Sequence, residues 1–281
     1  MAAAVAIVTD STAYLPEGLA RRHRLTIVPL QIVIGGAASE EGVDITAADT
    51  ARALRRWDPV TTSRPSPQRF ADAYGAAAAT GARGIVSVHL SAAMSGTVEA
   101  ARLAAEEADV PVRVVDSATI GMGLGFAALT AAAAAARGAA LEEVAEAAGR
   151  RARASRSLFY VDTLEHLHRG GRIGAAATLL GSALMVKPLL GIADGRIVPL
   201  EKVRTASRAL SRMEDLAVDF AGDLEVDVAV QHLGTESRAQ ALAGRLHERI
   251  SRLGVLHVGQ AGPVMGAHAG PGMLGVVVAP R

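Results

Sequence analysis

The sequence lacks cysteine altogether, and aromatic residues make up only 3% of its 281 residues. The absence of cysteine excludes disulfides, thiolate metal ligands and cysteine nucleophiles, and it favours a cytoplasmic protein. The scarcity of aromatic residues leaves few platforms on which bases or sugars could stack. Aliphatic side chains must therefore line any pocket that the chain forms.

The sequence also has no excess of charge of either sign, since it contains 29 basic and 28 acidic side chains. A formal net charge of +1 removes the usual electrostatic argument for a nucleic-acid-binding protein. The longest apolar run, around residues 125–136, is mostly alanine and is too short to cross a bilayer. The start of the chain lacks the basic region of a signal peptide. With 50% hydrophobic residues, we expect a globular chain with a sizeable core.

Short apolar runs alternate with helical segments in the first half of the sequence. Each predicted strand ends in a cluster of polar residues, and the strands are expected near residues 4–8, 60, 85–89 and 112–115. Helices are expected at 67–79, with Ser66 as N-cap and Pro67 as first residue, and at 98–108. This alternation predicts a parallel sheet with the four polar clusters along one edge, where ligands of open α/β folds bind.

The pattern changes beyond a charged helix at residues 141–156. A strand at 159–162, a short helix at 164–169 and a hairpin of 189–193 with 197–203 around Asp194-Gly195 are expected next. The remaining expected elements are helices at 206–220 and 237–253 and strands at 226–231, 255–258 and 274–278. The simplest division is an N-terminal α/β domain, residues 1–156, and a C-terminal α/β domain, residues 157–281.

Gly121, Gly123 and Gly125 follow a predicted strand and raise the question of a dinucleotide site. The fingerprint requires a further glycine three places after the second one, and Phe126 occupies that place. A dinucleotide-binding protein is therefore disfavoured.

Phosphate-binding lysines and metal-binding histidines are also not indicated. The only lysines, Lys187 and Lys202, are followed by proline and valine, so neither belongs to a P-loop. His166 and His168 are two apart, which does not stack them on a helix face, and His247 lacks the second histidine of the zinc-protease motif. We expect no metal site.

Hydroxyl side chains gather where two predicted strands end and helices begin. Thr62, Ser63, Ser95 and Thr97 are such residues, and helix N-termini attract negative charge. His268 lies in a run of small residues, GAHAGPG, which leaves its imidazole accessible. Neutral donors dominate this set, and they suit a single carboxylate better than a phosphate. The rest of such a ligand would be aliphatic.

A serine hydrolase is the alternative interpretation of the same residues. Ser95 precedes Gly96 at a strand-to-helix bend, and His268 and Asp10 could complete a catalytic triad. The run AMSG, however, lacks one glycine of the nucleophile elbow. A purely structural interpretation, with Ser95 as a helix N-cap supported by Thr97, also stays open.

Seven stretches in one order resemble the DegV family, whose members include the FakB fatty-acid-binding proteins of bacteria. They are IVTDSTAYLP, TSRPSPQRF, LSAAMSGTVEAARLAA, VDSATIGMGLG, FYVDTLEHLHRGGRIG, KPLLGIADGRIVPLEKVRT and GAHAGPGMLG. The resemblance spans nearly the whole chain. It implies a two-domain α/β protein that holds one long-chain fatty acid, such as palmitate, stearate or oleate, in a buried tunnel between its domains.

The resemblance also implies roles for individual residues. The hydroxyls of the TSxPS and SGT motifs bind the ligand carboxylate in the family, which assigns that role to Thr62, Ser63 and Ser95, with Gly96 and Thr97 in the same motif. The GxHxGPG segment adds His268. Supporting or docking roles fall to Asp10, Ser11, Arg172 and Arg204.

A partner protein follows from the same resemblance. FakB-type members present the bound acid to a separate ATP-dependent fatty acid kinase, which makes the acyl phosphate, and they perform no known chemistry or cofactor binding themselves. Transient contact with a membrane surface is compatible with that role. A distant resemblance of the family to dihydroxyacetone kinases leaves a phosphotransfer protein as a further alternative. The chain departs from the usual pattern at Met94, Val98 and Met185, and we expect these changes to affect chain-length preference and kinase pairing.

Overall fold

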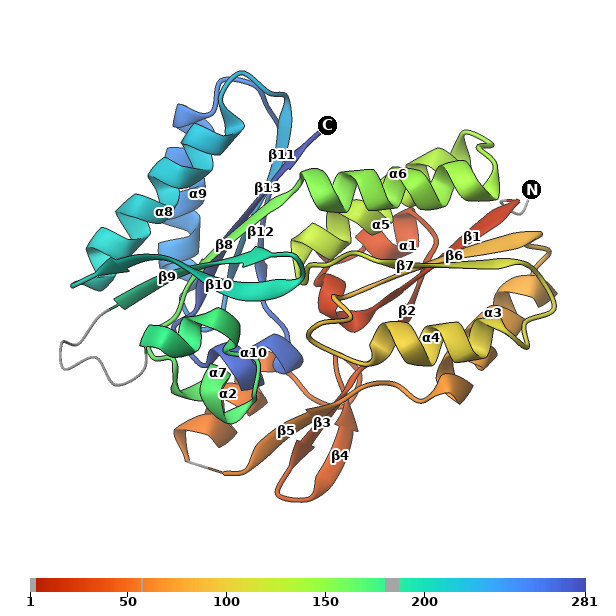
Figure 1. The fold of residues 1–281 in the computed structure, drawn as a ribbon, viewed down its shortest axis with the longest axis horizontal. Helices are drawn as coiled ribbons and strands as arrows, with labels where there is room; N and C mark the ends of the chain where they lie inside the picture. The colour runs from red at the N-terminus through yellow and green to blue at the C-terminus, as the bar shows by residue number, and fades with distance from the viewer. Residues whose placement is uncertain (1–3, 57, 180–186) are drawn as a thin grey trace.

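The computed structural model describes residues 4–56, 58–179 and 187–281, and the strands of these residues form three sheets (Figure 1). A parallel sheet belongs to the first half of the chain and a larger, mixed sheet to the second half, each covered by helices. The predicted mixed α/β architecture is therefore confirmed. Met185 lies outside the described residues.

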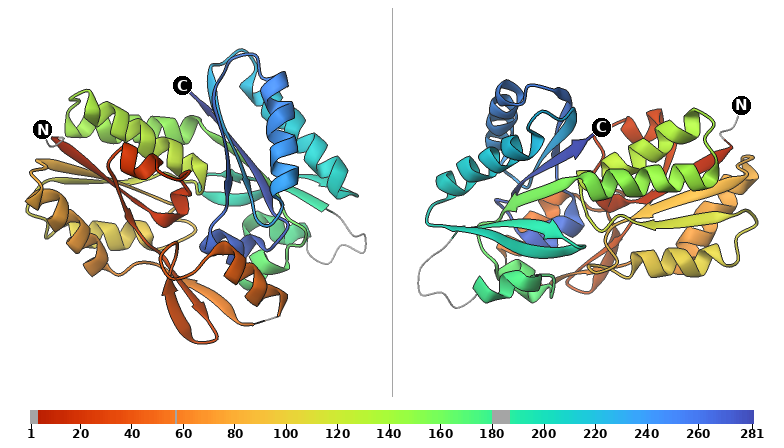
Figure 2. Two further views of the ribbon diagram at one scale, coloured as in Figure 1. Left: turned by 180° about the vertical axis from the view of Figure 1, so that it is seen from behind. Right: turned by 45° about the horizontal axis from the view of Figure 1, so that its top comes forward.

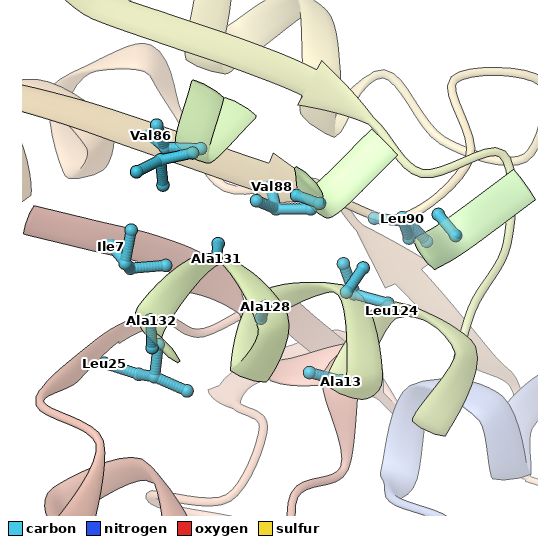
Figure 3. Packing of buried hydrophobic residues seen from close by; sticks show 14 of the residues in the cluster. Ile7, Ala13, Leu25, Val86, Val88, Leu90, Leu124, Ala128, Ala131 and Ala132 are labelled. Atoms are coloured by element: carbon cyan, nitrogen blue, oxygen red, sulfur yellow. The ribbon is translucent and has the colours of Figure 1, made fainter. Parts of the chain in front are cut away.

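The parallel sheet has strands from four places in the first 116 residues. In spatial order these are β2 (Leu25–Val28), β1 (Val5–Asp10), β6 (Gly84–His89) and β7 (Val112–Asp116). Helices α3 (Pro67–Ala79) and α4 (Thr97–Ala105) cover one face, and α5 (Met122–Ala136) and α6 (Leu141–Ala154) cover the other. Figure 3 shows Ala128 and Ala131 of α5 beside Ile7 of β1 and Val88 of β6. The small alanine side chains let this buried helix lie close to the sheet.

The strand that was expected near residue 60 belongs to a different sheet. β5 (Val60–Ser63) pairs antiparallel with β3 (Gln31–Ile34), which pairs antiparallel with β4 (Ala37–Glu40). The prediction that four polar clusters share the edge of one parallel sheet is thus wrong for this cluster. The glycine pair Gly35-Gly36, both with positive φ, forms the tight turn of a hairpin that the sequence analysis did not recognise. The short segments Ser11–Ala13, α1 (Leu19–Arg22) and α2 (Ala47–Arg55) complete this half.

The second half is built on a six-stranded sheet. Its spatial order is β10 (Arg196–Val203), β9 (Lys187–Ala193), β8 (Arg156–Tyr160), β13 (Leu274–Pro280), β11 (Val226–His232) and β12 (Leu253–Gln260). Helices α8 (Ala206–Ala221) and α9 (Glu236–Arg249) pack on one face. The predicted β9–β10 hairpin is confirmed, with Asp194 and Gly195 both at positive φ, as a two-residue hairpin turn requires.

The other face of this sheet is turned toward the first half of the chain. The short helix α10 (Pro263–Ala269) packs against both α2 and the short helix α7 (Glu165–Arg169), and Figure 2 shows this group from behind. A 3-10 segment, Gly174–Leu179, packs on β10. No helix of the described residues has both the length and the apolarity that crossing a bilayer would need.

The first turn of α5 is one of the places where the two halves are in direct contact. Gly121, with φ +69°, leads into the Met122 N–H, which donates to Gln231 Oε1 at 2.9 Å. A Cβ atom at Gly121 would lie 2.5 Å from that oxygen. The glycine run that resembles a nucleotide fingerprint therefore serves close packing.

We expect Gly121→Ala to lower the free energy of unfolding more than Gly138→Ala does. Both positions have positive φ, which costs alanine about 1 kcal/mol or more. Gly138 has open space around a Cβ, whereas the added methyl group at Gly121 displaces Gln231 from its hydrogen bond with Met122. Urea unfolding of the two variants measures the difference. Equal losses would show that the contact with Gln231 does not constrain the turn.

Candidate functional site

A cavity lies between the inner face of the six-stranded sheet and the carboxyl edge of the parallel sheet. It is a partly open hollow that residues of both halves line. Its lining is mainly apolar and comes from both halves of the chain; examples are Leu90, Ile120, Phe159, Leu167, Ile192 and Met265. Such walls suit a long aliphatic group.

Four polar side chains of the lining gather at one end of the cavity. Thr62 Oγ1 lies 2.9 Å from His268 Nε2, so a residue of the small sheet meets a residue of α10. Arg172 is close enough to His268 to influence its protonation, and its Nε–H donates to the carbonyl oxygen of Met94, the neighbour of Ser95. Thr62, Ser95, Arg172 and His268 thus form one polar end, to which both halves contribute.

The direction of Thr62 follows from its place in β5. Successive side chains of a strand point to opposite faces, and Thr62 is half-buried while Thr61 and Ser63 are exposed. The Ser63 hydroxyl donates to the Arg64 carbonyl oxygen at 3.4 Å and is not part of the cavity lining. The structure therefore brings Thr62 to the polar end and leaves Ser63 outside it.

Ser95 precedes the first turn of α4 and keeps its hydroxyl free of the helix terminus. Gly96, not Ser95, is the N-cap residue, and no side chain caps α4. The structural interpretation of Ser95 as an N-cap is therefore wrong. Its Oγ lies 2.9 Å from Oγ1 of Thr97, which is fully buried and outside the lining. Thr97 thus positions Ser95, and Gly96 contributes backbone.

His268 stands in the last turn of α10 as a neutral imidazole. Burial, and secondarily the charge of Arg172, lower the pKa of His268 from 6.5 to about 4. Its Nδ1 has no hydrogen-bond partner among the described residues. A Cβ atom on Gly170 would lie 2.1 Å from Nδ1, so glycine at that position makes room for the ring. A neutral histidine can offer one N–H donor to a ligand.

Arg172 brings a positive charge to the polar end. Its Nη1 donates to the Gly170 carbonyl oxygen at 2.7 Å and its Nε to Met94 at 3.1 Å, while the side chain remains exposed. Arg204 is exposed too, but it follows β10 and lies outside the lining. The two arginines that the sequence analysis grouped together therefore occupy different surroundings.

Asp10 does not belong to the polar end. It is fully buried, accepts hydrogen bonds from Thr12 and the Leu90 N–H, and lies 3.1 Å from Nδ1 of His89. It therefore cannot orient His268, whose Nδ1 is unpaired in the described chain. The triad of Ser95, His268 and Asp10 expected for a hydrolase is not assembled, because β1 directs Asp10 toward β6.

Ser11 belongs to a second network, which holds the start of α10. The Ser11 hydroxyl donates to Glu41 Oε2 at 2.5 Å, and Glu41 Oε1 accepts from the Val264 N–H at 2.7 Å. The Tyr14 hydroxyl donates to Glu41 and accepts from the Met265 N–H at 2.9 Å. Burial raises the pKa of Glu41 to about 7. Sequence reasoning missed Glu41 and Tyr14, because nothing local marks them as partners of a helix more than 200 residues away.

No group of three or more histidine, aspartate or glutamate side chains that could hold a metal ion occurs in residues 4–56, 58–179 and 187–281. The polar end instead offers two hydroxyls, one neutral imidazole and one guanidinium. These are donors to an anionic oxygen, and the adjoining walls are apolar.

Comparisons with known proteins identify relatives of full length. The family described as "Uncharacterised protein, DegV family" matches residues 4–281. A DegV domain-containing protein of Streptomyces coelicolor is 57% identical over 277 residues, which cover 99% of each chain.

Two similar solved structures are of proteins described as fatty-acid-binding. A fatty-acid-binding DegV family protein from Thermus thermophilus has a TM-score of 0.93 and 32% identity, and the match covers 99% of each chain. DegV from Bacillus subtilis, a fatty acid binding protein, has a TM-score of 0.90 and 31% identity, and the match covers 99% of each chain.

We expect Arg172→Met to raise the pKa of His268 while leaving it below 6.5. The substitution removes a positive charge that disfavours the imidazolium, but burial, the larger cause, remains. NMR titration of ¹⁵N-histidine-labelled protein, with the His268 signal assigned by its loss in His268→Asn, measures the shift. Arg204→Met is the matched control and should leave the pKa of His268 unchanged. If the pKa of His268 is unchanged in Arg172→Met, the charge of Arg172 does not act on the imidazole.

Proposed function

Because this chain belongs to the DegV family, we propose that it binds one long-chain fatty acid in the cavity and carries it to a partner enzyme. The acyl chain occupies the apolar part, and the carboxylate meets Thr62, Ser95, Arg172 and His268. The observation that carries the proposal is a cavity with mainly apolar walls and all four of these side chains in its lining.

The tail supplies most of the affinity in this proposal. Burial of a methylene group contributes about 0.8 kcal/mol, so a fifteen-carbon tail contributes roughly 12 kcal/mol before the costs of association. Aliphatic walls from both halves of the chain provide that burial. Palmitate, stearate and oleate are ligands of suitable length.

The head group fixes the orientation of the ligand. A buried carboxylate loses hydration at a cost of several kcal/mol unless donors replace the lost hydrogen bonds. The Thr62 and Ser95 hydroxyls, a neutral His268 and the Arg172 guanidinium are such donors. Their contribution is mainly to place the carboxylate, because they exchange one set of hydrogen bonds for another.

Transfer to a partner fits the position of the polar end. Arg172 is exposed there, so the carboxylate lies near the surface while the tail is enclosed. We propose that a separate ATP-dependent fatty acid kinase phosphorylates the presented carboxylate in the cytoplasm and that this chain performs no catalysis. The ligand then lies between an N-terminal domain, residues 1–156, and a C-terminal domain, residues 157–281.

The purified protein should carry a fatty acid, detectable by mass spectrometry of a denatured extract. Thr62→Val combined with Ser95→Ala should lower its retention severalfold, because two donors to the carboxylate are lost while the tail contacts remain. Thr61→Val is the matched control, since Thr61 lies on the same strand with its side chain exposed. Protein that is repeatedly free of lipid would contradict the proposal. Equal retention in all variants would exclude these hydroxyls as the head-group site.

Gly275→Val should shift the preference toward shorter fatty acids. Gly275 lines the cavity on β13, and a Cβ there meets its nearest atoms at 3.4–4.0 Å, so the strand tolerates the substitution while the side chain takes up cavity space. Gly259→Val, on strand β12 away from the cavity and with open space around a Cβ, is the control. Competition between acids of different length, read by native mass spectrometry, measures the shift. An unchanged length profile would mean that the tail does not pass Gly275.

A further inference from the structure

Two further polar side chains, not among the four of the polar end, line the cavity. Gln231 on β11 is 4% exposed and Ser157 on β8 is 8% exposed, and both are part of an otherwise apolar wall. Neither is needed to hold a carboxylate at Thr62, Ser95 and His268. The proposed function therefore leaves them without a role.

The carboxamide of Gln231 has one bonded end and one unbonded end. Its Oε1 accepts from the Met122 N–H at 2.9 Å, whereas its Nε2 is buried with no hydrogen-bond partner in the described chain. Rotating the amide by half a turn would place Nε2 against the Met122 N–H, donor against donor, so the orientation is fixed. The Nε2 end therefore remains a buried donor that needs an acceptor.

The register of the sheet places both residues on the face that forms the cavity wall. Gln231 is paired with Gly275, and Ser157 with Val277, two residues further along the same central strand. Gly275, which also lines the cavity, places no side chain beside Gln231. On the far side, Gly121 and Gly123 of the α5 start approach Gln231 and the hydrogen-bonded Thr119–Ser157 hydroxyls, so protein fills that side.

A plain hydrocarbon tail has no hydrogen-bond acceptor for the Nε2 donor. Covering a buried donor with methylene groups leaves its lost hydration uncompensated, whereas an oxygen on the tail would accept its hydrogen bond. A hydroxyl, ketone or epoxide oxygen has the required lone pairs, and the Ser157 hydroxyl can donate or accept beside it. Resting on the proposed function, we propose that this cavity is built for an oxygenated fatty acid, with the oxygen in the part of the tail that passes Gln231.

The test is a competition between hexadecanoic acid and its monohydroxylated isomers, with the hydroxyl at successive positions along the tail. Full-length protein is incubated with equal amounts of the parent acid and one isomer, and native mass spectrometry gives the ratio of the two bound forms. We expect at least one isomer to bind as tightly as the parent or tighter. In a wholly apolar tunnel every isomer would bind more weakly, because the hydroxyl would lose hydration without gaining a partner.

Gln231→Met removes the amide with little change in size and should lower the relative binding of that isomer about tenfold. Ser157→Ala is a second variant, which leaves the Met122 hydrogen bond intact and should weaken the same isomer to a smaller extent. The parent acid should be retained by both variants, which serves as the control for folding.

The outcomes separate the two proposals. If the wild-type protein binds hexadecanoic acid but every hydroxylated isomer more weakly, the inference is overturned and fatty-acid binding stands. The same holds if an isomer is preferred but neither substitution changes its ratio to the parent. If no acid binds at all, the proposed function fails and the inference fails with it.

Discussion

The cavity depends on how closely the start of α5 can approach the six-stranded sheet. Gly121 and Gly123 remove the side chains that would separate them, and the Met122 N–H donates to Gln231. Hydrogen bonds of Ser91 with Gly195 and of Thr119 with Ser157 join the same two halves. Elsewhere, Glu41 and Tyr14 hold the start of α10, which brings His268 to Thr62. The polar end is therefore a product of packing between segments that are remote in sequence.

Much of the fold could be predicted from local signals. The strands at 85–89 and 112–115 are short apolar runs followed by polar residues, and Asp194-Gly195 is a turn pair between two apolar runs. Each of these patterns lies within a few residues, so it can be recognised without knowledge of the tertiary structure. The hydroxyls Thr62 and Ser95 and the imidazole of His268 were also predictable, because motifs of small and hydroxyl residues mark them.

Sheet membership and hydrogen-bond partners could not be predicted in the same way. β5 has the apolar-then-polar pattern of its parallel counterparts, yet it pairs with β3, and no feature of residues 60–63 records that choice. Asp10 ends β1, and its partner is His89, 79 positions away, not His268. Gln231 is recognisable in the sequence as a polar residue of the mainly apolar strand β11. Its hydrogen bond with Met122, however, could be found only from the tertiary structure. Long-range pairing decided each of these cases.

Because both halves of the chain line the cavity, a bound ligand would stabilise the folded state. An occupant touches Leu90 and Ile120 from one half and Phe159 and Ile192 from the other, so it acts as an additional core element shared by both. A ligand that binds only the folded chain shifts the folding equilibrium by mass action. Under the proposed function, loaded molecules therefore resist proteolysis and heat better than unloaded ones.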